Sequence, residues 1–92
     1  MPKKSDANQK QIVEALRRMG VFVFDLHGAG KGCPDLLLAY LGQWHLVEIK
    51  TANGKLSEQQ IKFIERSSDI GKVSVVILRS VDQAINWVRS LA

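Results

Sequence analysis

Two short segments of the chain carry residues whose types and spacing could perform hydrolysis. Asp35 follows Pro34, and after a spacer of twelve residues Glu48 and Lys50 flank Ile49. Because side chains alternate faces along a strand, Glu48 and Lys50 should point to the same side. Two carboxylates brought close together repel each other unless a proton or a cation lies between them. Oxygen ligands, with water in the remaining positions, suit Mg²⁺ or Mn²⁺.

Lys50 adds an amine to this pair of carboxylates, and two roles are open to it. It can orient or deprotonate an attacking water, or it can stay charged and stabilise the charge that develops on phosphoryl oxygens. Either role serves metal-assisted hydrolysis of a phosphodiester. The alternative is that Glu48 and Lys50 form an exposed ion pair of little energetic value. The segment 45–50 otherwise has the pattern of a buried strand, and burying charges there requires a reason.

Hydrophobic periodicity predicts a hairpin that brings these segments together. We expect strands over 35–40 and 43–50 around a turn at Leu41-Gly42, so that Asp35 lies opposite the end that carries Glu48. A glycine loop over 27–33 precedes the hairpin.

The remaining elements follow from capping residues, glycines and apolar stripes. Ser57 and Gln60 form a capping-box pattern at the start of a helix. The apolar run from 73 to 78 predicts a central strand covered on both faces. The complete prediction is an α/β fold with a mixed four-stranded sheet flanked by helices, in the order helix (6–19), strand (21–26), strands 35–40 and 43–50, helix (57–70), strand (73–78) and a last helix capped by Ser80.

Composition narrows the class of protein. The 92 residues predict a single domain over 1–92, and 46% hydrophobic residues are ordinary for a globular protein. The net charge of +4 is compatible with a polyanionic partner.

No stretch approaches the roughly 18 apolar residues of a membrane span. One cysteine, Cys33, cannot form an internal disulfide, so we expect a reducing, cytoplasmic location. The glycine loop lacks the spacing of a P-loop, which argues against a nucleotide cofactor.

The acidic and basic residues together resemble the active-site signature of the PD-(D/E)xK nuclease superfamily, whose core is restriction-endonuclease-like. Residues 32–37, 46–50 and 56–60, with Phe63, resemble the VRR-NUC family of phage and repair nucleases, which is similar to Holliday junction resolvases. The resemblance implies a Mg²⁺- or Mn²⁺-dependent DNA endonuclease of phage type that acts as a homodimer on branched or four-way junction DNA. It also implies metal binding by Asp35, Glu48 and the backbone carbonyl of Ile49.

The superfamily often adds an acidic residue from the first helix, and this chain departs from that pattern. Glu14 lies nearly opposite the apolar stripe, whereas Gln9 lies on it. We therefore expect Gln9 to join the site, with Asp6 as the alternative, and the departure argues against a second tightly held metal. Gln60 faces the sheet, and it either only caps its helix or also reaches the active site.

Basic residues near the expected site are candidates for binding DNA phosphates. The candidates are His27, Lys31, Lys55 and Lys62, although residues of these types at such positions are more often incidental surface charges. Two other functions are compatible with the sequence. One is a non-catalytic nucleic-acid-binding module on the same fold, and the other is an interaction domain of a phage replication complex.

Overall fold

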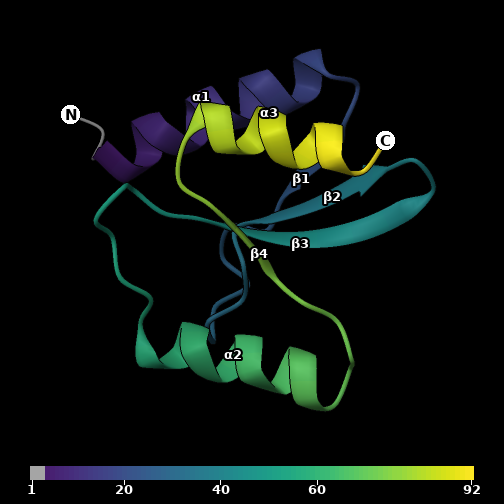
Figure 1. The fold of residues 1–92 in the computed structure, drawn as a ribbon. Coiled ribbons are helices and arrows are strands. Elements are labelled where there is room, and N and C mark those ends of the chain that lie inside the picture. The colour runs from purple at the N-terminus through teal and green to yellow at the C-terminus, as the bar shows by residue number, and fades with distance from the viewer. Residues whose placement is uncertain (1–3) are drawn as a thin grey trace.

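The computed structural model describes residues 4–92 and places four strands in one mixed sheet (Figure 1). Strands β1, β2 and β3 pair antiparallel in that order, and β4 pairs parallel to β3. The predicted order of elements and the mixed four-stranded sheet are confirmed. The elements are α1 (Lys4–Arg18), β1 (Phe22–Asp25), β2 (Leu36–Tyr40), β3 (Gln43–Ile49), α2 (Glu58–Asp69), β4 (Val76–Leu78) and α3 (Val81–Ser90).

Strand β4 differs from its prediction as a central strand covered on both faces. It has three residues and lies at the edge of the sheet, where it pairs only with β3. Along the apolar run only Leu78 is buried, Val76 and Ile77 are half-buried, and Val73 is exposed. The prediction was wrong because an apolar run shows that side chains are available for packing, but not how many neighbouring elements there are to cover them.

One face of the sheet carries the hydrophobic core. Helices α1 and α3 lie side by side over this face (Figure 1). The stripe predicted for the first helix is buried, since Ile12 and Leu16 are completely inaccessible to solvent. The other fully or nearly fully buried apolar residues of the core are Val21, Val23, Leu36, Leu38, Val47, Ile49, Leu78, Ala84 and Val88.

Of the helices within residues 4–92, only α2 lies on the opposite side of the sheet (Figure 1). Ser57 caps this helix as predicted, because its hydroxyl accepts a hydrogen bond from the Gln60 N–H and the Gln60 side chain accepts one from the Ser57 N–H. No residue of α2 is fully buried. This side of the sheet is therefore less tightly packed than the side under α1 and α3. No helix within residues 4–92 has the length and apolarity that crossing a membrane requires.

A tight turn sets the register of the β2–β3 hairpin. Leu41 and Gly42 both have positive φ, 50° and 81°, as the favoured two-residue hairpin turn requires. The turn pairs Tyr40 with Gln43 and leads to the pairing of Leu36 with Val47. Continued by one residue, this register sets Asp35 opposite Glu48, as predicted.

The core predicts a clear contrast between two leucines of the hairpin. Leu38 is fully buried and Leu41 is 64% exposed. We expect Leu38→Ala to lower the free energy of unfolding by about 2–5 kcal/mol, because it leaves a cavity in the core. The matched change Leu41→Ala should cost less than about 0.5 kcal/mol. Urea unfolding measures both values, and equal losses in the two variants would contradict the placement of the core.

Candidate active site

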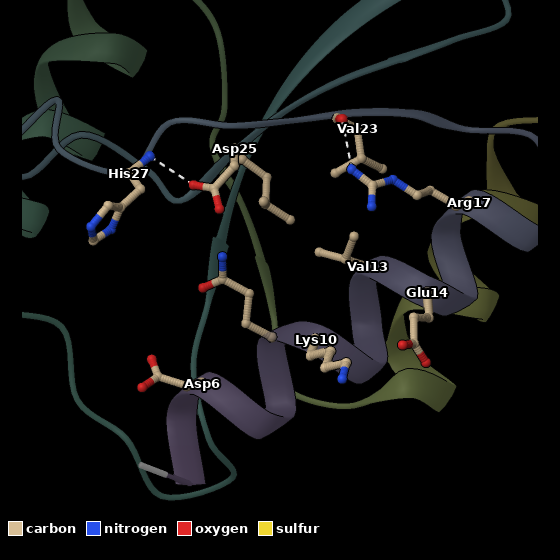
Figure 2. Close-up of a pocket in the computed structure, with 10 residues that line it drawn as sticks. Asp6, Lys10, Val13, Glu14, Arg17, Val23, Asp25 and His27 are labelled. Atoms are coloured by element: carbon tan, nitrogen blue, oxygen red, sulfur yellow. Dashed lines mark hydrogen bonds between the residues drawn. The ribbon is translucent and has the colours of Figure 1, made fainter. Parts of the chain in front are cut away.

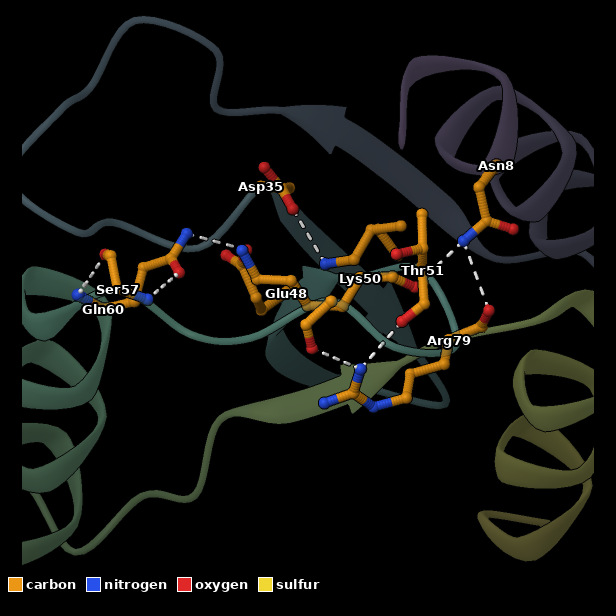
Figure 3. Close-up of polar contacts among 10 residues, drawn as sticks. Asn8, Asp35, Glu48, Lys50, Thr51, Ser57, Gln60 and Arg79 are labelled. Atoms are coloured by element: carbon orange, nitrogen blue, oxygen red, sulfur yellow. Dashed lines mark hydrogen bonds and ion pairs between the residues drawn. The ribbon is translucent and has the colours of Figure 1, made fainter. Parts of the chain in front are cut away.

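Asp35 is held at the start of β2 by a backbone contact across the hairpin. Its Oδ2 accepts a hydrogen bond of 2.8 Å from the N–H of Ile49 (Figure 3). This bond fixes one carboxylate oxygen next to the strand end that carries Glu48. Pro34, which is buried, restricts the chain just before Asp35.

Glu48 is the most buried charged residue among those described, with 2% of its surface exposed. Its Oε2 lies 3.4 Å from Nζ of Lys50 and accepts a hydrogen bond of 3.0 Å from Nε2 of Gln60. Figure 3 shows Gln60 reaching Glu48 from α2, on the opposite side from Lys50. The predicted convergence of Asp35, Glu48 and Lys50 is therefore present in the structure.

The environment of Glu48 favours its neutral form. Burial is the largest cause and the nearby charge of Asp35 the second, and together they raise the pKa of this carboxyl to about 7. The ammonium of Lys50 acts in the opposite direction without cancelling these effects. At neutral pH and without a bound cation, Glu48 is therefore protonated in part of the molecules. A divalent cation would replace that proton.

Gln60 combines the two roles that the sequence left as alternatives. Its Oε1 accepts a hydrogen bond of 2.8 Å from the N–H of Ser57, which completes the capping box. Its Nε2 donates to Glu48, as described above. Because one amide group makes both bonds, the start of α2 is tied directly to the active-site carboxylate.

Gly32 allows the glycine loop to approach α2 closely. It has a φ of +78°, and a Cβ built on it would lie 2.2 Å from the carbonyl oxygen of Gln59. Any other residue here would clash with backbone and would also be strained. The loop that leads to Asp35 therefore lies directly against the first turn of α2, beside Gln60.

The donor set fits a hard divalent cation. Within residues 4–92, no group of three or more histidine, cysteine or acidic side chains has a metal-binding arrangement. A cation at this site would instead have two carboxylates, from Asp35 and Glu48, with a carbonyl oxygen and water as further ligands. Mg²⁺ is bound in this way in many proteins, because it retains several of its waters.

Comparison with known proteins agrees with this geometry. The family model of the VRR-NUC domain matches residues 2–82. This chain belongs to the VRR-NUC family. A solved structure described as "VRR_NUC domain" superimposes with a TM-score of 0.79 at 28% sequence identity, and the match covers 99% of this chain and 100% of that chain. No match was found among curated proteins. VRR-NUC domains are nuclease-type domains, which implies DNA as the substrate and divalent metal in general.

The first helix of this VRR-NUC domain contacts the strand end of Lys50 through a residue other than the predicted Gln9 or its alternative, Asp6. Gln9 and Asp6 line a groove between α1 and β1 together with Asp25 and His27 (Figure 2). The residue of α1 that contacts the strand end of Lys50 is Asn8, which sequence reasoning missed. Asn8 precedes the buried Ile12 by one turn, so its place on the buried face was a signal that it needs polar partners.

The predicted DNA-binding residues are all exposed, but they lie in different places. Lys31 and Lys62 line one hollow between the glycine loop and α2, together with Arg66. Lys55 lies in the loop before α2, and His27 lies at the end of β1, where its N–H donates to Asp25. Lys31 and Lys62 are the pair that the structure brings together.

Two other reactive side chains do not join the site. Burial and the neighbouring charges of Glu48 and Asp35 raise the pKa of the Cys33 thiol, which disfavours a thiolate nucleophile. His45 points to the core face, where its ring packs edge-on against Trp87 at a centroid distance of 5.1 Å. His45 therefore lies on the face of the sheet opposite Glu48.

The raised pKa of Glu48 predicts how stability depends on pH in the metal-free protein. The ordinary pKa is 4.5 and the folded value is about 7, so the folded state holds a proton that the unfolded chain has released between these values. Stability should therefore fall as pH rises from about 5 to 8, by an amount on the order of 1–3 kcal/mol from this residue. In Glu48→Gln this contribution is absent.

Urea unfolding in EDTA across this pH range measures the difference between the two proteins. The unfolding free energy of the wild type should fall relative to that of Glu48→Gln as pH rises. Parallel curves for the two proteins would show that Glu48 titrates normally.

Proposed function

We propose that this VRR-NUC protein is a metal-dependent DNA endonuclease that hydrolyses phosphodiester bonds with Asp35, Glu48 and Lys50. The observation that supports this most strongly is the buried Glu48, which lies beside a second carboxylate and an ammonium on the open face of the sheet. A buried carboxyl group lowers the stability of the fold, and a bound cation would offset this cost, so such groups are often found at functional sites.

The divalent cation, Mg²⁺ or Mn²⁺, would be held by Asp35, Glu48 and the backbone carbonyl of Ile49. Such a cation supplies an acidic bound water and stabilises negative charge on the phosphate. The protein contributes ligands that are already oriented. The Ile49 N–H fixes the carboxylate of Asp35, and the Gln60 amide fixes that of Glu48.

Lys50 is placed to act on the scissile phosphate. Its Nζ lies beside Glu48, and 19% of its side chain is exposed, so it faces both the carboxylates and the open side of the sheet. Its ammonium would stabilise the additional negative charge on the phosphate in the transition state.

The expected substrate is branched or four-way junction DNA. Lys31, Lys62 and Arg66 lie together next to α2 and would contact phosphates on one side of the site. His27 and Lys55 would contact the backbone from the neighbouring loops. Two copies of the site related by a two-fold axis would suit paired cuts in a symmetric junction.

A homodimer is supported by an apolar surface on the open face of the sheet. Phe22, Phe24 and Trp44 are more than half exposed, and all three lie on the face opposite the core. Phe22 and Trp44 pack edge to face, with ring centroids 6.3 Å apart. Such a cluster is costly to expose in a monomer, and a second copy would cover it. The other tryptophan, Trp87, packs against the core.

Substitutions at the site should separate catalysis from binding. We expect Asp35→Asn and Lys50→Ala to lower the rate of DNA cleavage by about 10³-fold or more. Asp35→Asn removes a metal ligand, and Lys50→Ala removes the ammonium that would stabilise the phosphate in the transition state. Folding and DNA affinity should change little. The matched control Asp82→Asn, on the exposed first turn of α3, should cleave like the wild type.

The assay uses duplex, flap and four-way junction DNA with Mg²⁺, Mn²⁺ or EDTA. Full activity in either active-site variant would contradict the assignment. Binding without cleavage by the wild type would indicate a non-catalytic nucleic-acid-binding module. Neither binding nor cleavage would indicate an interaction domain.

The proposed dimer surface predicts a change in oligomeric state. Trp44→Glu and Phe24→Glu should shift the protein from dimer to monomer, because each buries a charge in the interface. Ile70→Glu, at the far end of α2 and 71% exposed, is the control and should remain a dimer. Light scattering after size-exclusion chromatography measures the mass. A monomeric wild type, or a dimeric Trp44→Glu, would contradict this surface.

A further inference from the structure

Arg79 uses its guanidinium to hold backbone rather than to face solvent. It follows β4 directly, and its Nη1 donates hydrogen bonds of 2.7 Å to the carbonyl oxygens of both Thr51 and Gly54 (Figure 3). The carbonyl of Ala52 lies 3.5 Å from the same nitrogen. These carbonyls belong to the loop that leaves the active site immediately after Lys50.

Asn8 continues this contact from the first helix. Its Nδ2 donates a hydrogen bond of 3.0 Å to the carbonyl oxygen of Lys50 and one of 3.2 Å to that of Arg79. The N–H of Lys50 donates to the carbonyl of Leu78, at 3.1 Å. Both backbone polar groups of Lys50 therefore have partners, one from β4 and one from α1.

Lys50 needs such support because it lies just past the end of β3, which ends at Ile49. A residue at a strand end is free to fray unless its backbone groups are bonded. Carbonyl oxygens that point toward a common position repel each other. A guanidinium between them offsets this repulsion, because its N–H groups donate hydrogen bonds to the oxygens. Arg79 and Asn8, here called the strand-end clamp, thus fix the chain from Lys50 to Gly54.

We infer that Asn8 and Arg79 are positioning residues that hold Lys50 against Glu48 in the geometry needed for cleavage, an inference that rests on the proposed endonuclease function. Neither residue contacts the carboxylates in the structure, so they act through the backbone of Lys50. A displacement of about 1 Å at a catalytic group can reduce a rate by about 10²-fold. Because the guanidinium of Arg79 is bonded to loop carbonyls, we expect it to make no contact with DNA phosphates.

The test compares Arg79→Lys and Asn8→Ala with the wild type. Lysine keeps the charge but lacks the planar guanidinium whose N–H groups bond the loop carbonyls. In single-turnover cleavage of the preferred DNA with Mn²⁺, we expect both variants to be slower by about 10–100-fold. DNA affinity measured in Ca²⁺ should stay within about twofold, since no phosphate contact is lost. Circular dichroism at the assay temperature confirms that each variant is folded.

Two controls and a rescue distinguish positioning from a general loss of structure. Arg89→Lys and Asn86→Asp, at exposed positions of α3, should cleave at the wild-type rate. Added guanidinium ion should restore part of the rate of Arg79→Ala and none of the rate of Lys50→Ala. A merely destabilised fold would not respond in this way, because guanidinium destabilises proteins.

Three results would overturn the inference. Folded clamp variants that cleave at the wild-type rate show that Lys50 does not depend on the clamp. Weakened DNA binding with an unchanged rate at saturation shows that Arg79 contacts DNA. A wild type that cleaves no DNA under any condition overturns the proposed function, and the positioning role with it, whereas an active wild type with active variants overturns the positioning role alone.

Discussion

The structure depends on one unfavourable placement, a carboxylate buried in the sheet directly beside a second carboxylate. Glu48 is nearly inaccessible and lies opposite Asp35 across the hairpin. Its other neighbours are donors, namely the ammonium of Lys50 and the amide of Gln60. Such a group is tolerated because these contacts offset part of the desolvation cost, and because Glu48 can hold a proton when no cation is bound.

The two faces of the sheet differ in composition: one carries the hydrophobic core and the other carries the candidate active site. The face under α1 and α3 holds the buried apolar residues, so a short chain obtains one continuous core. The face toward α2 is only partly covered and holds the carboxylates, Lys50 and the exposed aromatic side chains. The strand-end clamp joins the faces, because Asn8 extends from the core-covering helix to the backbone of Lys50.

Local signals in the sequence were sufficient for much of the fold and for the centre of the site. The Leu41-Gly42 turn and the Ser57 cap depend on residues close in sequence, and both were predicted. The edge position of β4 was not predicted, because it depends on which elements pack beside it. Asn8 and Arg79 were missed because their partners are backbone carbonyls 25 to 71 residues away, and backbone groups leave no trace in the sequence.

The central claim is that Asp35 and Glu48 share one divalent cation. The most direct measurement is calorimetric titration of Mn²⁺ into the wild type and into the double variant Asp35→Asn/Glu48→Gln, without DNA. Binding to the wild type, lost or weakened by at least about tenfold in the folded double variant, is the predicted result, because both amides are poorer ligands for a hard cation. Equal Mn²⁺ affinity in the two proteins would contradict the account.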